Sequence, residues 1–106
     1  MNIEERAVLI RISQTWRPRM QESELYEKTR KWWRLNPRRD PDYAVAVRAG
    51  TVLGVYAIDG WVQSPDGRRW AFEGRRDDAL SERYTGSDVS HYFRRGAANP
   101  ITYVNC

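Results

Sequence analysis

Apolar and polar positions near the N-terminus alternate in the way that is typical of a β-strand. Val8, Ile10 and Ile12 fall on one face of an extended chain, and the residues between them fall on the other face. Leu9 interrupts this alternation, because it places an apolar side chain on the more polar face. The pattern predicts a first strand over residues 6–13, followed by a loop that contains a proline.

The apolar period then changes to that of an amphipathic helix. Leu25, Thr29 and Trp32 recur three or four residues apart, which places them roughly on one face. Ser23 is the expected N-cap, and acidic side chains in the first turn and basic ones in the last turn suit the helix dipole. The pattern predicts a helix over residues 23–34, ended by an Asn-Pro pair, and favours burial of Trp32 in the core.

Two segments rich in Val, Tyr and Ile follow at residues 43–47 and 51–58, with an Ala-Gly pair between them. This arrangement is the signal of a β-hairpin. A Pro-Asp-Gly turn sequence comes next. A third strand is then expected over residues 69–73, with Trp70 and Phe72 on its buried face.

The remainder of the chain predicts a second helix, a capped turn and a last strand, over residues 77–84, 87–93 and 101–104. The order of elements is β-α-β-β-β-α-β, and the hairpin favours antiparallel pairing. We therefore expect an α+β fold built on a small, mostly antiparallel β-barrel or pseudo-barrel. It has about five strands and two or three short helices, in a single domain over residues 1–106.

The composition fits one folded domain of 106 residues. Five Trp and six Tyr residues provide area for a core despite a charged fraction of 30%. Cys106 is the single cysteine, so an internal disulfide is impossible and a reducing compartment is expected. The first residues do not resemble a signal peptide, and no apolar run has the length of a membrane span. The expected location is cytoplasmic, with no membrane partner.

Positive charge gathers in one segment of the chain. The net charge is +4, whereas residues 17–39 carry eight basic and three acidic side chains, a net charge of +5, which leaves about −1 for the rest. Arginine outnumbers lysine by 16 to 2. A guanidinium group pairs with phosphate and stacks on rings, although a genome rich in G and C would also favour arginine. Tryptophans are interleaved with these charges, as in a surface that binds nucleic acid.

The order of elements and the hairpin segment YAVAVRAGTVLGVYAIDGW, at residues 43–61, resemble the PUA-like superfamily, which includes the ASCH, EVE and YTH domains. The closing segment GAANPITYVNC also looks like the last strand of small proteins of this type. The resemblance covers most of the chain as an arrangement of elements, without a diagnostic motif. It implies a small pseudo-barrel that binds RNA or DNA, often with a modified or flipped base in an aromatic-walled pocket.

Charge and aromatic placement predict a nucleic-acid site in two parts. The backbone phosphates are expected on Arg17, Arg19, Arg34, Arg38 and Arg39. The pocket for a base is expected to be formed by Trp16, Trp33, Trp61, His91 and Asn99. Four of these have a structural alternative: Trp33 as a core residue, Trp61 as a rim residue of the barrel, His91 as a structural histidine, and Asn99 in local backbone bonding at an Asn-Pro turn.

The sequence does not favour catalysis, and we expect a protein that is not an enzyme. No Gly-x-Ser-x-Gly motif presents a serine to His91, and no glycine-rich phosphate loop precedes a lysine. One histidine and one terminal cysteine cannot build a standard zinc site, so no metal and no cofactor are expected. Asp40, Asp42 and Asp59 leave a metal-dependent nuclease as a weaker alternative.

The sequence therefore predicts a nucleic-acid-binding module whose partner is DNA or RNA, with a modified or flipped base as the candidate ligand of the pocket. The alternative is a protein-interaction module, such as a phage or defence-system accessory protein, in which Arg and Trp side chains anchor an acidic protein partner. The choice between DNA and RNA, the base and the oligomeric state stay open at this point.

Overall fold

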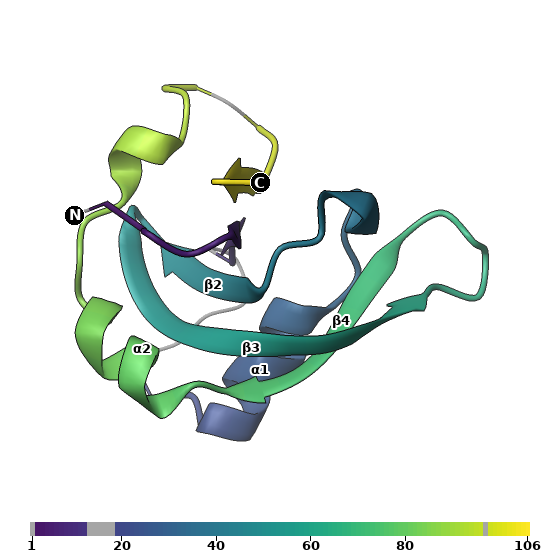
Figure 1. The fold of residues 1–106 in the computed structure, drawn as a ribbon, viewed down its shortest axis with the longest axis horizontal. Coiled ribbons are helices and arrows are strands. Elements are labelled where there is room, and N and C mark those ends of the chain that lie inside the picture. The colour runs from purple at the N-terminus through teal and green to yellow at the C-terminus, as the bar shows by residue number, and fades with distance from the viewer. Residues whose placement is uncertain (1, 13–18, 97) are drawn as a thin grey trace.

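The computed structural model describes residues 2–12, 19–96 and 98–106. They form an α+β fold in which two helices pack on one five-stranded mixed sheet (Figure 1), and the predicted order of elements is confirmed. None of the helices in these ranges has the length and apolar character needed to cross a membrane. The elements are β1 (Ala7–Arg11), α1 (Glu22–Arg30), η1 (Pro37–Arg39), β2 (Tyr43–Arg48), β3 (Thr51–Gln63), β4 (Trp70–Arg76), α2 (Asp78–Tyr84), η2 (Ser90–Tyr92) and β5 (Ile101–Val104), where η is a 3-10 helix.

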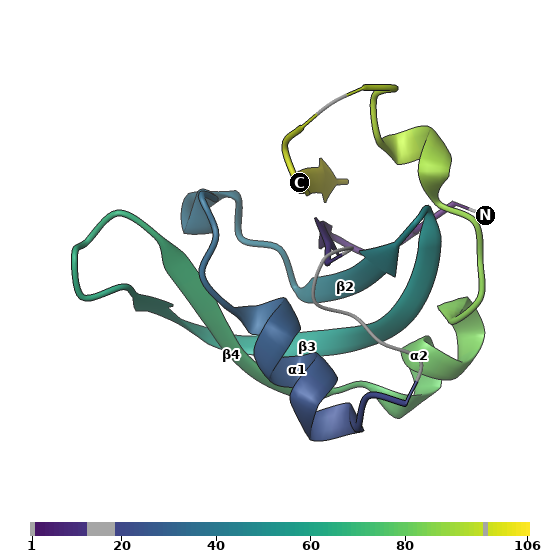
Figure 2. The ribbon, with the colours of Figure 1, turned by 180° about the vertical axis from the view of Figure 1, so that it is seen from behind.

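The strands are ordered β4-β3-β2-β1-β5 across the sheet. β1 runs parallel to β2, with Leu9 opposite Val45, and the other neighbouring pairs are antiparallel, which confirms the mostly antiparallel sheet predicted from the sequence. A parallel pair needs a long crossover, and α1 lies in that connection. Figure 2 shows α1 in front of β3 and β4, so the crossover helix covers this face of the sheet.

The predicted closure of the sheet into a barrel is wrong. Among the described residues, β4 and β5 are edge strands that do not pair, and they lie apart in both ribbon views (Figures 1 and 2). Trp33 exchanges two backbone hydrogen bonds of 2.9 Å with Trp70 at the start of β4. The N–H of Asn36 donates to the Tyr103 hydroxyl on β5 at 2.6 Å. Residues 32–36 thus occupy the opening that strand pairing would have closed.

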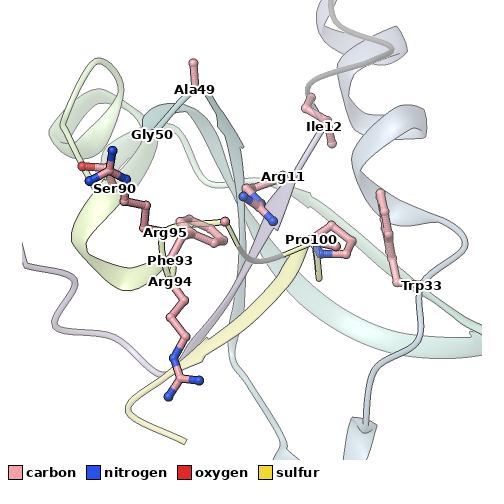
Figure 3. Close-up of a pocket in the computed structure, with 12 residues that line it drawn as sticks. Arg11, Ile12, Trp33, Ala49, Gly50, Ser90, Phe93, Arg94, Arg95 and Pro100 are labelled. Carbon is pink, nitrogen blue, oxygen red and sulfur yellow. The ribbon is translucent and has the colours of Figure 1, made fainter.

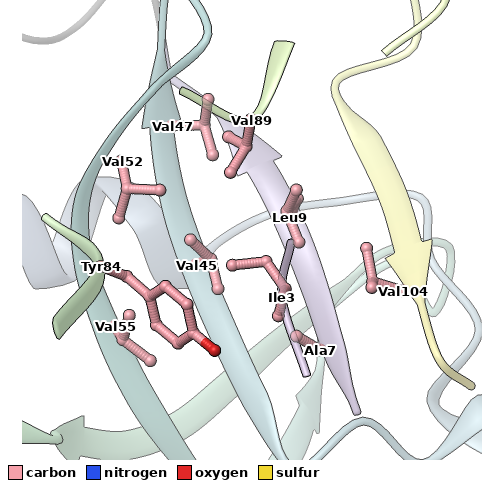
Figure 4. Packing of buried hydrophobic residues seen from close by; sticks show 10 residues of the cluster. All are labelled: Ile3, Ala7, Leu9, Val45, Val47, Val52, Val55, Tyr84, Val89 and Val104. Carbon is pink, nitrogen blue, oxygen red and sulfur yellow. The ribbon is translucent and has the colours of Figure 1, made fainter. Parts of the chain in front are cut away.

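β1 is buried on both of its faces. Leu9 belongs to a core cluster on the side of α2, together with Tyr84 (Figure 4). Val8 and Ile10 belong to a second cluster on the side of α1, together with Leu25. A central strand between two cores carries consecutive apolar residues. This explains why Leu9 interrupts the alternation seen in the sequence.

The helix α1 begins one residue earlier than predicted and ends four residues earlier. Its N-cap is Gln21, whose side chain makes no capping hydrogen bond, so the predicted cap at Ser23 is wrong. Leu25 and Thr29 are buried, as the apolar period predicts. Trp32 lies beyond the helix and is 37% exposed, so its predicted burial is wrong.

A tertiary contact explains why α1 ends at Arg30. If the helix continued, the backbone N–H of Trp33 would donate to the carbonyl of Thr29. Instead, the indole N–H of Trp33 takes that carbonyl at 2.7 Å, and its backbone N–H donates to the carbonyl of Trp70 at 2.9 Å. The carbonyl of Thr29 and the backbone N–H of Trp33 thus already have partners. Continuing the helix would pair these two groups with each other and gain no hydrogen bond.

The hairpin of β2 and β3 forms as predicted, and two residues connect its strands. Ala49 and Gly50 have φ values of 50° and 79°. Positive φ at both central positions is the signature of a type I′ turn. A Cβ atom at Gly50 would lie 2.8 Å from the Cβ atom of Ser90, so the turn packs closely on η2. β3 is longer than predicted and reaches Gln63, with a bulge near Ile58 in its pairing with β4.

The helix α2 is capped and tied to the sheet by its own side chains. The carboxylate of Asp77 accepts from the N–H of Leu80 at 2.9 Å, which makes it the N-cap. The buried Ser81 hydroxyl accepts from the N–H of Val55 at 2.9 Å and donates to the carbonyl of Val55 at 3.0 Å. These bonds fix α2 against β3.

Candidate nucleic-acid interface

A hollow of about 690 Å³ opens at the end of the sheet where β1 finishes. The end of β1, the turn between β2 and β3, and the chain between η2 and β5 surround it (Figure 3). Its described lining residues are Arg11, Ile12, Trp33, Ala49, Gly50, Ser90, Phe93, Arg94, Arg95, Gly96, Ala98 and Pro100.

A second hollow, of about 450 Å³, adjoins the first and shares Trp33, Ala98 and Pro100 with it. It lies in the opening between β4 and β5, where the chain leaves α1. Its described lining residues are Trp32, Trp33, Arg34, Arg69, Ala98, Asn99, Pro100 and Ile101. We call the two hollows together the arginine cleft.

The described lining of the arginine cleft holds no acidic residue and five arginines, Arg11, Arg34, Arg69, Arg94 and Arg95. Outside the cleft, Arg30, Arg75, Arg76 and Arg83 are paired with carboxylates, Arg83 with Glu4 at 3.0 Å. Within the described residues, the guanidinium groups of Arg34, Arg94 and Arg95 make no hydrogen bond or ion pair. The cleft therefore presents positive charge that the protein does not neutralise there, and such a surface attracts anions.

Arg11 shapes the wall of the arginine cleft through contacts of its own. Its guanidinium donates to the carbonyl of Asn99 at 2.8 Å and lies 5.0 Å from the centroid of the Phe93 ring. Its backbone N–H donates to the carbonyl of Pro100 at 2.9 Å. These contacts hold both ends of the loop that carries Arg94 and Arg95.

The two arginines of this loop leave it in different directions (Figure 3). Arg95 extends toward Ser90, whereas Arg94 points away from Arg11. The backbone N–H of Ser90 donates to the carboxylate of Asp88 at 2.8 Å. Hydrogen bonds from the Ser90 side chain and backbone hold the pKa of Asp88 below its ordinary value. Asp88 lies beside the first hollow and is thus a carboxylate that accepts hydrogen bonds from Ser90.

Two neighbouring tryptophans line the second hollow in different ways. Trp33 is half-buried and packs against the core on the side of α1. Trp32 is the one large apolar side chain of the described residues that is exposed. It lies in the same lining as Arg34 and Arg69. A ring with an open face beside cations is suited to stack on a base next to a bound phosphate.

The structure brings three of the sequence-predicted site residues to the arginine cleft: Trp33, Arg34 and Asn99. The side-chain oxygen of Asn99 accepts from the N–H of Ile101 at 3.0 Å, so the predicted turn-capping alternative for Asn99 is confirmed. Its role in reading a base stays a prediction.

Trp61 and His91 lie elsewhere and line neither hollow. Trp61 is opposite Phe72 in the sheet and packs against the core on the side of α1. His91 is exposed, with its ring 4.2 Å from that of Tyr92 and its Nε2 3.1 Å from the amide oxygen of Asn2. The structure therefore does not bring these two side chains together with the aromatic residues of the cleft.

Arg34 is the one predicted phosphate-binding arginine that the structure places in the described lining of the cleft. Arg19 is exposed in a turn ahead of α1, and Arg38 is exposed in η1. Trp16 and Arg17 lie outside the described residues.

Arg39 makes structural contacts near the chain end. Its guanidinium lies 4.6 Å from the centroid of the Tyr103 ring and donates to the carbonyl of Cys106 at 2.9 Å. Its own carbonyl accepts from the guanidinium of Arg6 at 2.9 Å. This arginine ties η1 to β5 and does not line the cleft.

Sequence reasoning missed Arg94 and Arg95, although a signal for them exists. No acidic residue follows Asp88, so residues 89–106 carry these two arginines without a compensating charge. In residues 17–39, by contrast, ion pairs on and next to α1 compensate part of the positive charge. The larger positive charge of residues 17–39 is therefore partly neutralised by acidic side chains in the folded protein. The smaller positive charge of residues 89–106 has no acidic side chain within the same segment.

In the part of the chain that the structure describes, no three His, Cys, Asp or Glu side chains gather closely enough to hold a metal ion. Asp40, Asp42 and Asp59 form no such group there. Asp59 instead pairs with Arg75 at 2.6 Å. The nuclease alternative thus finds no ligand set among these carboxylates.

Comparison of the chain with known protein families, curated proteins and solved structures finds no match. Chemically, the cleft offers uncompensated guanidinium groups in one hollow and indole rings with further guanidinium groups in the next. This combination can bind an anion and an aromatic ring side by side.

Proposed function

We propose that this protein is a nucleic-acid-binding module without catalytic activity of its own. The observation that carries the proposal is the arginine cleft, whose described lining holds five arginines, two tryptophans and no acid. Guanidinium groups bind phosphate in a bidentate geometry, and indole rings stack on bases. DNA and RNA present phosphates and bases in regular alternation, so they match both features of the cleft.

The proposal includes membership of the PUA-like superfamily. It is supported by the order β-α-β-β-β-α-β and by a mixed sheet with a cleft where β1 ends. The open sheet departs from the closed pseudo-barrel that the resemblance implies. A modified or flipped base remains a candidate ligand, since a matched pocket can offset the cost of unstacking a base.

The salt dependence of binding tests the proposed function. A labelled strand of about 12 nucleotides, within the site size of a small domain, is titrated by fluorescence anisotropy at roughly 50 to 200 mM NaCl. The logarithm of the affinity should fall linearly with the logarithm of the salt concentration, by about 0.7 for each phosphate contacted. Replacing Arg94 and Arg95 together by Ala should lower this slope by about 1 to 2 and weaken all sequences alike.

The matched control replaces Arg75 and Arg83 by Ala, which removes the same charge from two ion-paired arginines outside the cleft. It should change the slope less than the cleft variant does. Affinity that is independent of salt, or absent at low salt, would contradict the proposal. Added Mg²⁺ or Mn²⁺ should cause no cleavage of the strand, and turnover would show that the protein is an enzyme.

The exposure of Trp32 beside arginines also favours a second candidate function, the binding of an acidic protein surface. Trp and Arg are the side chains that most often anchor protein interfaces. A protein partner carries no condensed counterion atmosphere, so its affinity should depend less steeply on salt than that of DNA or RNA. The same titration therefore separates the two candidates.

A further inference from the structure

The two hollows of the arginine cleft differ in chemistry. The first is lined by three arginines, Arg11, Arg94 and Arg95, and by the small surfaces of Gly50 and Ser90, with the rings of Phe93 and Trp33 also in its lining. The second has an aromatic wall, formed by Trp32 and Trp33, together with further arginines. The first hollow is therefore suited to a phosphate, and the second is suited to a ring with polar edges.

The backbone beside Trp32 is anchored, although the Trp32 side chain is exposed. Its neighbour Trp33 is anchored by two backbone hydrogen bonds to Trp70 and by the bond from its indole to Thr29. The backbone next to Trp32 is thus held in place, while 37% of Trp32 stays exposed. A stacking platform that is positioned before binding loses little freedom when the ligand arrives.

The residues that line both hollows lie on the path of any ligand that extends from one hollow into the other. Trp33 and Pro100 line both hollows, so a ligand that fills one hollow passes these residues to reach the other. A nucleotide consists of a ring and a phosphate joined by a sugar, and adjoining hollows of different chemistry suit such a unit.

On the basis of the nucleic-acid-binding function above, we propose that the ligand of the arginine cleft is a single strand. One base lies on the ring of Trp32 in the second hollow, and successive backbone phosphates lie on Arg95 and Arg94, which leave the loop beside the first hollow in different directions. In a duplex, each base is covered on both faces and paired at its edge. A base can enter a hollow from a duplex only after it has been unstacked and unpaired, whereas a single strand presents its bases directly.

The first experiment uses the unmodified protein and four probes of about 12 nucleotides. They are a single-stranded DNA, the same strand without its bases, its duplex, and the matching single-stranded RNA. We expect the base-containing strands to bind roughly 5- to 150-fold more tightly than the abasic strand, which is the range that stacking of a base on an aromatic ring produces. The duplex should bind more weakly than the single strand of the same sequence.

The second experiment replaces Trp32. Trp32→Ala should weaken binding of the base-containing strand by roughly 5- to 150-fold, leave the abasic strand unaffected and preserve the salt slope. Trp32→Phe should restore most of the affinity, because it keeps a stacking ring. The matched control is Lys31→Ala, at an exposed neighbouring position that lines neither hollow, and it should change the affinity by no more than about threefold.

The outcomes separate this proposal from the function on which it rests. If the duplex binds as tightly as the single strand, or if Trp32→Ala weakens all probes equally, the single-strand assignment is overturned while nucleic-acid binding stands. If none of the probes binds at low salt, the nucleic-acid function itself falls. Should Trp32→Ala fail to fold, the comparison between base-containing and abasic strands still decides, because it uses the unmodified protein.

Discussion

Trp32 and Trp33 are neighbours in the chain, yet their environments differ. Trp33 is half-buried and places its indole N–H 2.7 Å from the carbonyl of Thr29. Trp32 follows the end of α1, and 37% of its surface is exposed. The helical period favoured burial of Trp32, since it counted this residue as a continuation of the face formed by Leu25 and Thr29, and it left the burial of Trp33 open. The end of a helix thus decides which of two adjacent rings is available to a ligand.

Tyr56 shows how a single residue makes stability depend on pH. Its buried hydroxyl donates to the carboxylate of Glu22 at 2.7 Å, and Glu22 also pairs with Arg76 at 2.8 Å. Burial first, and then the neighbouring Glu22, raise the pKa of Tyr56 far above its ordinary value. The folded protein therefore keeps this hydroxyl protonated where the unfolded chain ionises, and stability falls as the pH rises above about 10.

We expect Tyr56→Phe to remove this part of the alkaline dependence. At neutral pH the variant should lose about 1–2 kcal/mol of unfolding free energy, because a hydrogen bond to a carboxylate is lost while the ring stays packed. Above a pH of about 10, its free energy of unfolding should fall less steeply than that of the unmodified protein. Urea unfolding over a series of pH values measures both effects. Equal slopes would mean that Tyr56 ionises alike in the folded and unfolded chains.

At the scale of elements, the turn between β2 and β3 is the part of the cleft wall most sensitive to substitution. Gly50 has a φ of 79°, and a Cβ atom there would approach Ser90 to 2.8 Å. We expect Gly50→Ala to lower the free energy of unfolding by about 1–3 kcal/mol, because a left-handed conformation and a close contact both oppose the added methyl group.

The matched control for Gly50→Ala is Gly60→Ala. Gly60 lies in β3, its φ is not in the left-handed region, and a Cβ atom there would meet nothing within 4 Å. Chemical denaturation of the two variants measures the difference. A similar loss of unfolding free energy in both variants would contradict this prediction, because the positive φ and the close contact at Gly50 would then add no cost of their own.

Local patterns in the sequence were sufficient to predict most of the elements. The hairpin of β2 and β3 and the last strand, Ile101–Val104, follow from short apolar segments with turn residues at their ends. The end of α1 and the open sheet could not be predicted in this way. Both depend on the contact of Trp33 with Trp70, which forms only when the chain segments after α1 and before β4 meet. A tertiary contact here overrides the helical period.

At the scale of the whole molecule, the arginine cleft combines residues from separate parts of the chain. Arg11 ends β1, Arg34 follows α1, Arg69 precedes β4, and Arg94 and Arg95 follow η2. No window of the sequence contains this set, so charge counted along the chain pointed to Arg34 and missed the other members. The fold gathers them at the end of the sheet where β1 finishes and at the adjoining opening between the edge strands β4 and β5.

This gathering of like charges should cost stability when no ligand is bound. We expect replacement of Arg94 and Arg95 by Ala to raise the melting temperature at low salt by about 1–3 °C, since exposed charge interactions are worth a few tenths of a kcal/mol. The gain should shrink as salt screens the repulsion. Differential scanning fluorimetry at several salt concentrations measures this dependence.

The control for this measurement is the variant in which Arg75 and Arg83 are replaced by Ala. Each of these two arginines lies against a carboxylate, so their replacement by Ala should lower the melting temperature or leave it unchanged. A cleft variant that gains stability while it loses affinity for nucleic acid shows the trade-off expected of a binding surface. A loss of stability at low salt in the cleft variant would instead mean that Arg94 and Arg95 support the packing of their loop. The uncompensated charge of the cleft would then have a structural cause, and the main support for an anion site would be removed.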